Sequence, residues 1–344
     1  MDHTRGGGAG QYLPWSAAMD RALYGPEGFF RRPEGPAGHF RTSVHASPQF
    51  AAALLRLAVE VDRALGRPER FHVVDLGAGR GELLAAMLDA VDDAHPLAGR
   101  LHPVAVELAE RPDPLPERIA WANRPPEGVT GLLVANEWLD NVPCDVVRLE
   151  PDGPRLLEVA PDGRERAAGE PDDSQQAWLE CWWPGWSGGE PGQRAEIGLM
   201  RDAAWADAVA SLRAGVAVAI DYAHAVDSRP PFGTLTGYAH GREVPPVPDG
   251  SCDLTAHVAL DACAAAAQHV ADWALTLDQR TALRRLGVDG ARPDLATASA
   301  DPLGYLRALS RAGAAAELTD PLGLGGFRWL VQGVSVPRAT SLED

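Results

Sequence analysis

Residues 71–91 read FHVVDLGAGRGELLAAMLDAV. The first six residues are mostly apolar and predict a buried strand, 71–76, that ends beside Asp75. Three glycines then stand at every second position: Gly77, Gly79 and Gly81. The residues after them have helical spacing, and we expect a helix over 81–94. A glycine loop between a strand and a helix allows a ligand to approach the backbone and meet the helix N–H groups.

The segments around this stretch alternate between apolar runs and amphipathic patterns. Before it, SPQFAAALLRLAVEVDRALG predicts a helix with Ser47 as N-cap, Pro48 in its first turn and Gly66 at its end. A shorter helix is expected after Ser16. Later strands are predicted at LHPVAVELAE, ERIAWA, VTGLLVANE, GVAVAIDYA and GGFRWLVQGVSV. This alternation indicates a doubly wound α/β core with helical material ahead of it.

Two stretches interrupt the core pattern. Residues 151–195 are rich in Pro, Gly and acids and hold four tryptophans, and residues 227–256 read as a long loop. We therefore expect an N-terminal helical and loop extension, a first half of the core, a Trp-rich insertion or lid, and a second half of the core. Their predicted bounds are 1–66, 67–150, 151–200 and 201–344.

Composition excludes several classes of function. The 344 residues carry a formal net charge of -17, which disfavours nucleic acid and anionic membranes as partners. All 31 basic residues are Arg, so a Walker A loop and a Schiff-base lysine are excluded. The four cysteines have no C-x-x-C spacing, so we expect reduced thiols and no metal site. Neither a secretory signal nor a membrane span is recognised, and a cytoplasmic protein is expected.

The spacing of the glycine loop discriminates between ligands. A dinucleotide loop would have its third glycine at position 82, where Glu82 stands, so a nicotinamide oxidoreductase is disfavoured. The pattern D-x-G-x-G-x-G from Asp75 onward instead resembles the loop of S-adenosylmethionine (SAM) methyltransferases. Glu107 ends the next strand, and a carboxylate there is a natural double acceptor for the two ribose hydroxyls. A plain tight turn and an exposed strand-end acid are the alternatives.

A second polar group follows the strand of VTGLLVANE, in VANEWLDNVP at 134–143. Asn136, Glu137 and Asp140 stand at the carboxyl end of a core strand, where ligand crevices open in such sheets. If the chain turns helical there, Glu137 and Asp140 share one face. Alternatively, Asn136 or Asp140 only caps a turn. The stretch lacks the N-P-P-Y/F pattern of adenine methyltransferases.

Taken in order, these motifs resemble the MidA-like SAM-dependent methyltransferases, which include mitochondrial complex I assembly-factor arginine methyltransferases. The matching segments are MDRALYGPEGFF, GHFRTS, DLGAGRGEL, NEWLDNVP, AEIG, IDYAH and DLTAHV. The resemblance covers most of the chain. It implies a class I methyltransferase fold, Rossmann-like, with a seven-stranded doubly wound sheet, an N-terminal helical extension and inserted segments.

The resemblance also implies roles for individual residues. Glu137 and Asp140, with Asn136, would stand near the methyl acceptor, which in the family is an arginine of a respiratory complex subunit. A guanidinium is always charged, so two carboxylates would hold it. The implied cofactor is SAM, and its expected contacts are Asp75, Gly77, Gly79, Gly81, Glu107, Thr42 and Ser43.

One departure from the family pattern concerns the acceptor. The family's T-S-P-E-I-S is TSVHAS here, so His45 stands where a Glu is usual. His45 is a candidate general base, or a loop histidine without a catalytic role. The replacement leaves two alternatives to arginine methylation: a methyltransferase for a small-molecule acceptor, and a SAM-binding assembly scaffold without turnover.

Overall fold

The computed structural model describes residues 11–31 and 42–343. Its centre is a seven-stranded sheet of order β16-β17-β10-β5-β2-β3-β4. β17 runs antiparallel to both of its neighbours, and the other pairs are parallel. The strands are β2 (Phe71–Leu76), β3 (Leu101–Val106), β4 (Ala120–Ala122), β5 (Val129–Asn136), β10 (Leu212–Asp221), β16 (Trp273–Asp278) and β17 (Arg328–Val334). The seven-stranded doubly wound sheet expected from the sequence is confirmed.

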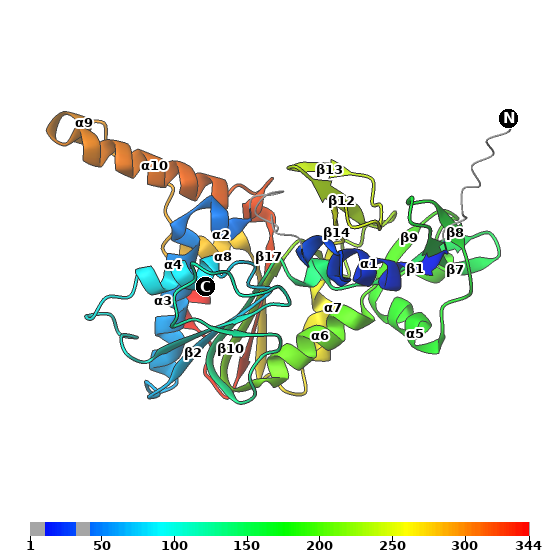
Figure 1. Ribbon diagram of the computed structural model, residues 1–344, viewed down its shortest axis with the longest axis horizontal. Coiled ribbons are helices and arrows are strands. Elements are labelled where there is room, and N and C mark those ends of the chain that lie inside the picture. Colours follow the sequence, from blue (N-terminus) through cyan, green and yellow to red (C-terminus); the bar gives the residue numbers. More distant parts are fainter. Residues whose placement is uncertain (1–10, 32–41, 344) are drawn as a thin grey trace.

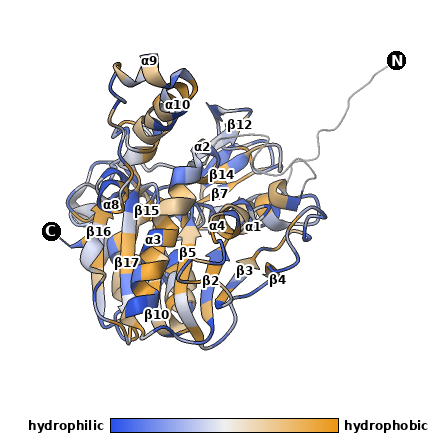
Figure 2. Cartoon of the chain, turned by 90° about the vertical axis from the view of Figure 1, so that its left-hand side faces the viewer, coloured by the Kyte–Doolittle hydropathy of each residue, from blue (hydrophilic) through white to orange (hydrophobic). Residues whose placement is uncertain are grey.

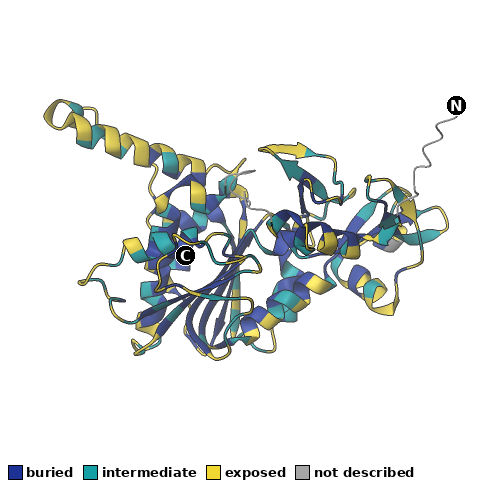
Figure 3. Cartoon of the chain, viewed as in Figure 1, coloured by how far each residue is buried: buried dark blue, intermediate teal, exposed yellow. Residues whose placement is uncertain are grey.

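Helices cover both faces of this sheet (Figure 1). Successive residues of one strand pack on opposite faces of the sheet. Val73 packs against a first layer of helices on one face, and Val74 packs against a second layer on the other face. This explains why the strands are apolar on successive residues (Figure 2) and buried along most of their length (Figure 3). The first layer holds α3 (Pro48–Ala64), α4 (Glu82–Asp89) and α8 (Gln279–Arg285), and the second holds α6 (Leu199–Ala210) and α7 (Leu260–Ala266).

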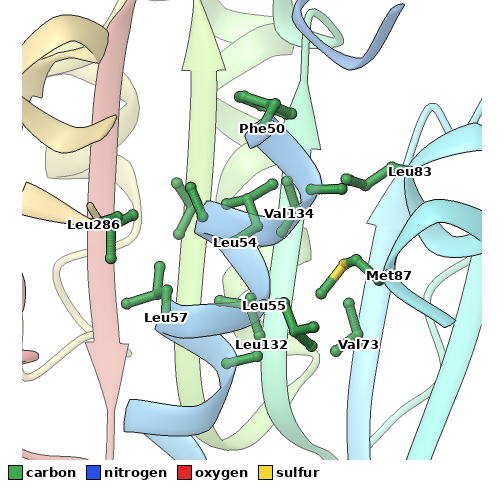
Figure 4. Packing of buried hydrophobic residues seen from close by; sticks show 14 of the residues in the cluster. Phe50, Leu54, Leu55, Leu57, Val73, Leu83, Met87, Leu132, Val134 and Leu286 are labelled. Atoms are coloured by element: carbon green, nitrogen blue, oxygen red, sulfur yellow. The ribbon is translucent and has the colours of Figure 1, made fainter. Parts of the chain in front are cut away.

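Helix α3 shows how local sequence and packing agree. Ser47 caps it by accepting a hydrogen bond from the Gln49 N–H, and Pro48 occupies the first turn, as predicted. Phe50, Leu54 and Leu57 then point from α3 toward the strands (Figure 4) and are fully buried. Truncating one such leucine to alanine costs about 2–5 kcal/mol in a packed core.

A second sheet lies beside the core and contains the Trp-rich stretch. Its order is β1-β7-β6-β9, with β8 paired to β7. Trp178, Trp183 and Trp186 are buried against it, so they pack a core of their own. Its elements are β1 (Leu13–Pro14), β6 (Asp145–Glu150), β7 (Gly153–Val159), β8 (Glu165–Ala167) and β9 (Arg194–Ile197), with α1 (Trp15–Tyr24), α5 (Asp173–Trp182) and η4 (Trp186–Gly188). The four predicted segment boundaries stay a prediction.

The expected long loop at 227–256 is wrong. It contains a three-stranded antiparallel sheet, in which β12 pairs with both β13 and β14. These strands are only three or four residues long and lie among Gly and Pro, so their composition resembles a loop. The elements here are β12 (Thr236–Ala239), β13 (Arg242–Val244) and β14 (Asp253–Thr255), and a separate parallel pair is β11 (Ala223–His224) with β15 (Val258–Ala259).

Two helix boundaries also differ from expectation. Helix α1 begins at Trp15 after Pro14, so Ser16 is not its N-cap; the Ser16 hydroxyl instead donates to Asp145 Oδ1 at 2.5 Å. Helix α4 ends at Asp89, because turns occupy the chain before β3. Residues 38–41 of the GHFRTS motif lie outside the described residues.

The remaining helices are short, except for one that projects from the body. Helix α10 (Pro302–Leu318) extends outward (Figure 1), and its first half is largely exposed (Figure 3). Leu303 and Leu306 in this half are exposed. The short helices are α2 (Ser43–Ala46), α9 (Thr297–Ala300), η1 (Phe29–Arg31), η3 (Leu139–Asn141), η5 (Leu324–Gly326) and η6 (Thr340–Leu342). Within residues 11–31 and 42–343, we find no helix with the length and apolarity needed to cross a membrane.

Candidate active site

A cavity of about 1180 Å³ opens at the carboxyl ends of β2, β3 and β5. It contains most of the residues singled out from the sequence, although they come from four separate segments. This is the position at which ligands bind in open α/β sheets. The predicted site residues that line the cavity are Thr42, His45, Asp75, Gly77, Gly79, Glu107, Asn136, Glu137 and Asp140.

The three glycines of the loop all have positive φ, but they serve different purposes. A Cβ on Gly77 would lie 2.7 Å from Trp138 Cδ1, and one on Gly81 would lie 2.6 Å from Leu115 Cδ1. These two glycines therefore permit packing inside the protein, and Gly81 is not part of the cavity lining. Among the described residues, a Cβ on Gly79 would approach only Glu82 Oε2, at 3.6 Å. Gly79 thus leaves room in the cavity itself.

Glu107 joins the glycine loop to the end of β3. Its Oε2 accepts the Gly79 N–H at 3.0 Å, and its Oε1 accepts the N–H groups of Leu108 and Ala109. Each carboxylate oxygen has two lone pairs, so Oε2 retains capacity for a ligand hydroxyl. A carboxylate acceptor therefore lies beside open space in the cavity. After the role predicted for them, we call residues 77–81 with Glu107 the cofactor end of the cavity.

Glu137 directly follows β5 in a conformation that is unusual for a non-glycine residue. Its φ is 51°, so the helix considered for this stretch does not begin here; a single 3₁₀ turn, η3, follows instead. Its Oε1 accepts the Ser43 N–H and the Asn136 side-chain N–H, both at 3.1 Å. Burial raises the pKa of Glu137 to about 7. Backbone strain of this kind is often found at functional sites.

Three buried acids lie around Glu137: Asp140, Asp221 and Asp253. After the role predicted for them, we call the cavity-lining residues Asn136, Glu137, Asp140 and Asp253 the acceptor end of the cavity; Asp221 lies outside the lining. Asp221 Oδ2 accepts the N–H groups of Leu139 and Asp140, and so fixes the η3 turn. Burial raises the pKa of all three aspartates. Among the described residues, no group of His, Cys, Asp and Glu is arranged to hold a metal ion.

Two oxygen atoms at the acceptor end have no hydrogen-bond partner in the part of the chain that the structure describes. Asn136 Oδ1 and Asp140 Oδ1 are buried, and neither has a hydrogen-bond partner among residues 11–31 and 42–343. The other oxygen of Asp140 accepts the Thr255 hydroxyl at 2.6 Å. A buried acceptor without a donor is costly, so a ligand with N–H groups would compensate both atoms.

Helix α2 contains two of the site residues predicted from the TSVHAS segment, Ser43 and His45, and Thr42 directly precedes it. Ser43 is fully buried outside the cavity lining; its N–H contacts Glu137, and its hydroxyl accepts a hydrogen bond from Gln279. His45 Nδ1 lies 2.8 Å from the Thr42 hydroxyl, and His45 Nε2 lies 3.4 Å from Glu82 Oε1. His45 therefore contacts the helix after the glycine loop. Its role as a base stays a prediction.

Several residues of the cavity were not proposed as site residues from the sequence. Tyr24 and Phe30 line it and stack with ring centroids 5.6 Å apart. Asp253 reaches the lining from β14. Tyr24 and Phe30 belong to the motif MDRALYGPEGFF, and Asp253 belongs to DLTAHV. These family motifs were the signal by which the three residues could have been found. Buried Arg201 on α6 has no such signal.

Comparisons with known proteins agree with this geometry. Residues 53–277 match the sequence model of a family described as "Putative S-adenosyl-L-methionine-dependent methyltransferase". A Burkholderia thailandensis protein crystallised with S-adenosyl-homocysteine has a TM-score of 0.76 and 24% identity, over 96% of this chain and 90% of that one. A native crystal structure of an uncharacterized protein from the same organism gives 0.75 and 25%, with the same coverage. No curated protein matches the chain.

Proposed function

The chain belongs to this family of SAM-dependent methyltransferases, and we propose that its acceptor is the side chain of an arginine in a protein substrate. The observation that carries the proposal is the pair of oxygens, Asn136 Oδ1 and Asp140 Oδ1, that have no partner among the described residues and lie beside Glu137 and three buried aspartates. A guanidinium brings five N–H donors in one plane and a permanent positive charge. Both properties complement a buried acidic site with vacant acceptors.

The residues of the two ends have separate tasks in this mechanism. When bound, SAM supplies an electrophilic methyl group on a sulfonium centre. At the cofactor end, Glu107 and the open position at Gly79 hold and align the cofactor. At the acceptor end, Asp140 and Asn136 hold the guanidinium through their vacant oxygens.

Glu137 is the general base in the proposed reaction. A guanidinium nitrogen must lose a proton to attack as a nucleophile, and a base is most effective when its pKa lies near the working pH. Burial raises the pKa of Glu137 to about 7. The Ser43 N–H and the Asn136 amide fix the orientation of its carboxylate.

The test is transfer of a labelled methyl group from SAM to matched peptide libraries that differ only in carrying arginine or lysine. We expect label in the arginine library and not in the lysine library. The label should survive mild alkali, which would release it if a carboxylate had been methylated instead. Label in a metabolite extract but in neither library would replace the proposal by a small-molecule acceptor. High-affinity SAM binding without label in any pool would favour the scaffold.

A further inference from the structure

Arg201 connects the two segments that build the acceptor end. It lies on α6, with 2% of its surface exposed. Its guanidinium donates to the Asp140 carbonyl at 2.7 Å and the Val142 carbonyl at 3.0 Å, both in the turn after β5. It also donates to the carbonyls of Ala256 and His257, at 2.9 and 3.0 Å, directly after β14. One planar fork therefore joins two segments that are far apart in sequence.

Each of these segments contributes acids to the cavity. The turn after β5 carries Glu137 and Asp140, and β14 carries Asp253. Two other contacts cross the same junction: the Thr255 hydroxyl donates to Asp140 Oδ2 at 2.6 Å, and the Ala256 N–H donates to the Asp140 carbonyl at 3.2 Å. Because Arg201 also donates a hydrogen bond to the Asp140 carbonyl, it fixes the position of that turn relative to β14.

The charge of Arg201 also acts on the acids. Its hydrogen bonds go to neutral carbonyl groups, so no carboxylate neutralises it through one of them. Its field opposes the effect of burial on the pKa of Asp140 and of Asp221. Hydrogen bonds from a charged donor in a low-dielectric interior are stronger than neutral ones. Both effects reach the acceptor end.

We propose that Arg201 is a positioning residue for the methyl acceptor: it clamps the Glu137–Asp140 turn against β14, without contributing to the cofactor end. The proposal rests on the proposed function in taking these acids as the acceptor-binding groups. It predicts that loss of Arg201 separates turnover from cofactor affinity.

The experiment compares Arg201→Met and Arg201→Lys with Arg229→Met. Arg229 is the control, because its side chain is also buried at 5% exposure and donates outside the cavity lining, to the carbonyl oxygens of Trp182 and His224 and to the Asp261 carboxylate. Three quantities are measured: hydrogen exchange by segment, the dissociation constant for S-adenosyl-homocysteine, and kcat with the arginine peptide library. Arg201→Lys keeps the charge and serves as the test if Arg201→Met does not fold.

We expect exchange of residues 137–143 and 253–258 to rise about tenfold or more in Arg201→Met and less in Arg201→Lys, because charged hydrogen bonds are lost. Residues 77–82 keep their exchange rate, the dissociation constant stays within about threefold, and kcat falls about tenfold or more. Arg229→Met leaves the exchange of 137–143, the dissociation constant and kcat unchanged.

The proposal is overturned if both acceptor segments keep wild-type exchange. It is also overturned if the glycine loop loosens equally and cofactor affinity falls, because Arg201 would then support the fold as a whole. If the wild-type protein transfers no label to the arginine library, the arginine acceptor is wrong. Hydrogen exchange and the dissociation constant for S-adenosyl-homocysteine then still decide the role of Arg201.

Discussion

The cofactor end and the acceptor end of the cavity differ in how the chain builds them. The cofactor end comes from one short loop, 77–81, and Glu107, which is bonded to that loop through the Gly79 N–H. The acceptor end combines side chains from the end of β5, the turn after it and the start of β14, and a clamp, Arg201, from a helix. The first uses backbone groups and open space, whereas the second uses buried charges. A change at one end should therefore leave the other intact.

The largest effect is expected at the acceptor end. Glu137→Gln keeps the shape of the side chain but removes the base, so methyl transfer should fall about 10³-fold. The dissociation constant for SAM should change less than about threefold, because the cofactor end is untouched. Labelled transfer and calorimetry measure the two quantities. The control is Glu117→Gln, at an exposed site ahead of β4. If Glu137→Gln lost SAM affinity together with methyl transfer, the two ends of the cavity would not be separate.

The opposite separation is expected for the glycine loop. Gly79→Val places a branched side chain in the cavity at a φ of 57°, which β-branched residues avoid, so SAM affinity should fall about 100-fold. Gly99→Val imposes a similar backbone penalty at φ 71° with no neighbouring atom within 4 Å, and should bind SAM normally. Calorimetric titration compares them. Equal binding by both variants would show that the loop is only a turn.

The raised pKa of Glu137 should appear in the pH dependence of stability without ligand. Folding keeps the carboxyl protonated up to about pH 7, whereas the unfolded group ionises near its ordinary pKa of 4.5. Glu137 therefore destabilises the fold increasingly as the pH rises from 4.5 to 7, and the cost is then constant. Glu137→Gln should be more stable relative to wild type at pH 8 than at pH 5, by about 2 kcal/mol in the free energy of unfolding. Denaturant titrations at pH 5 and pH 8 measure this difference. If the stability difference between Glu137→Gln and wild type were the same at both pH values, the burial effect would be refuted.

The smallest effect is expected for Glu107. Glu107→Gln retains one carbonyl oxygen to accept N–H groups but loses the charge and one acceptor, so SAM affinity should fall about tenfold. Calorimetry with SAM and with S-adenosyl-homocysteine should give similar losses, because both carry the ribose. A loss confined to SAM would mean that Glu107 acts on the sulfonium charge instead of the ribose hydroxyls.

The same contrast explains how much could be predicted from the sequence. Strand β2 and the glycines after it were predicted because periodicity and glycine spacing are local signals. The caps of α3 were predicted for the same reason. Asn136, Glu137 and Asp140 were recognised because polar residues follow an apolar strand and match a family motif.

Other features depend on contacts that no local pattern records. The positive φ of Glu137 is imposed by its place between β5 and η3, where its N–H donates to the Ile220 carbonyl of β10. Asp253 reaches the cavity only because β14 pairs with β12 in a region that reads as loop. Arg201 is one arginine among 31, and only the fold reveals its four carbonyl partners.

The most direct test of the central claim is calorimetric titration of the wild-type protein with S-adenosyl-homocysteine, repeated with Gly79→Val. The cavity geometry predicts one molecule bound per chain, with a dissociation constant on the order of micromolar that is lost in the variant. Absence of binding to the wild type, or equal binding to Gly79→Val, would contradict the assignment of the cofactor to the glycine loop.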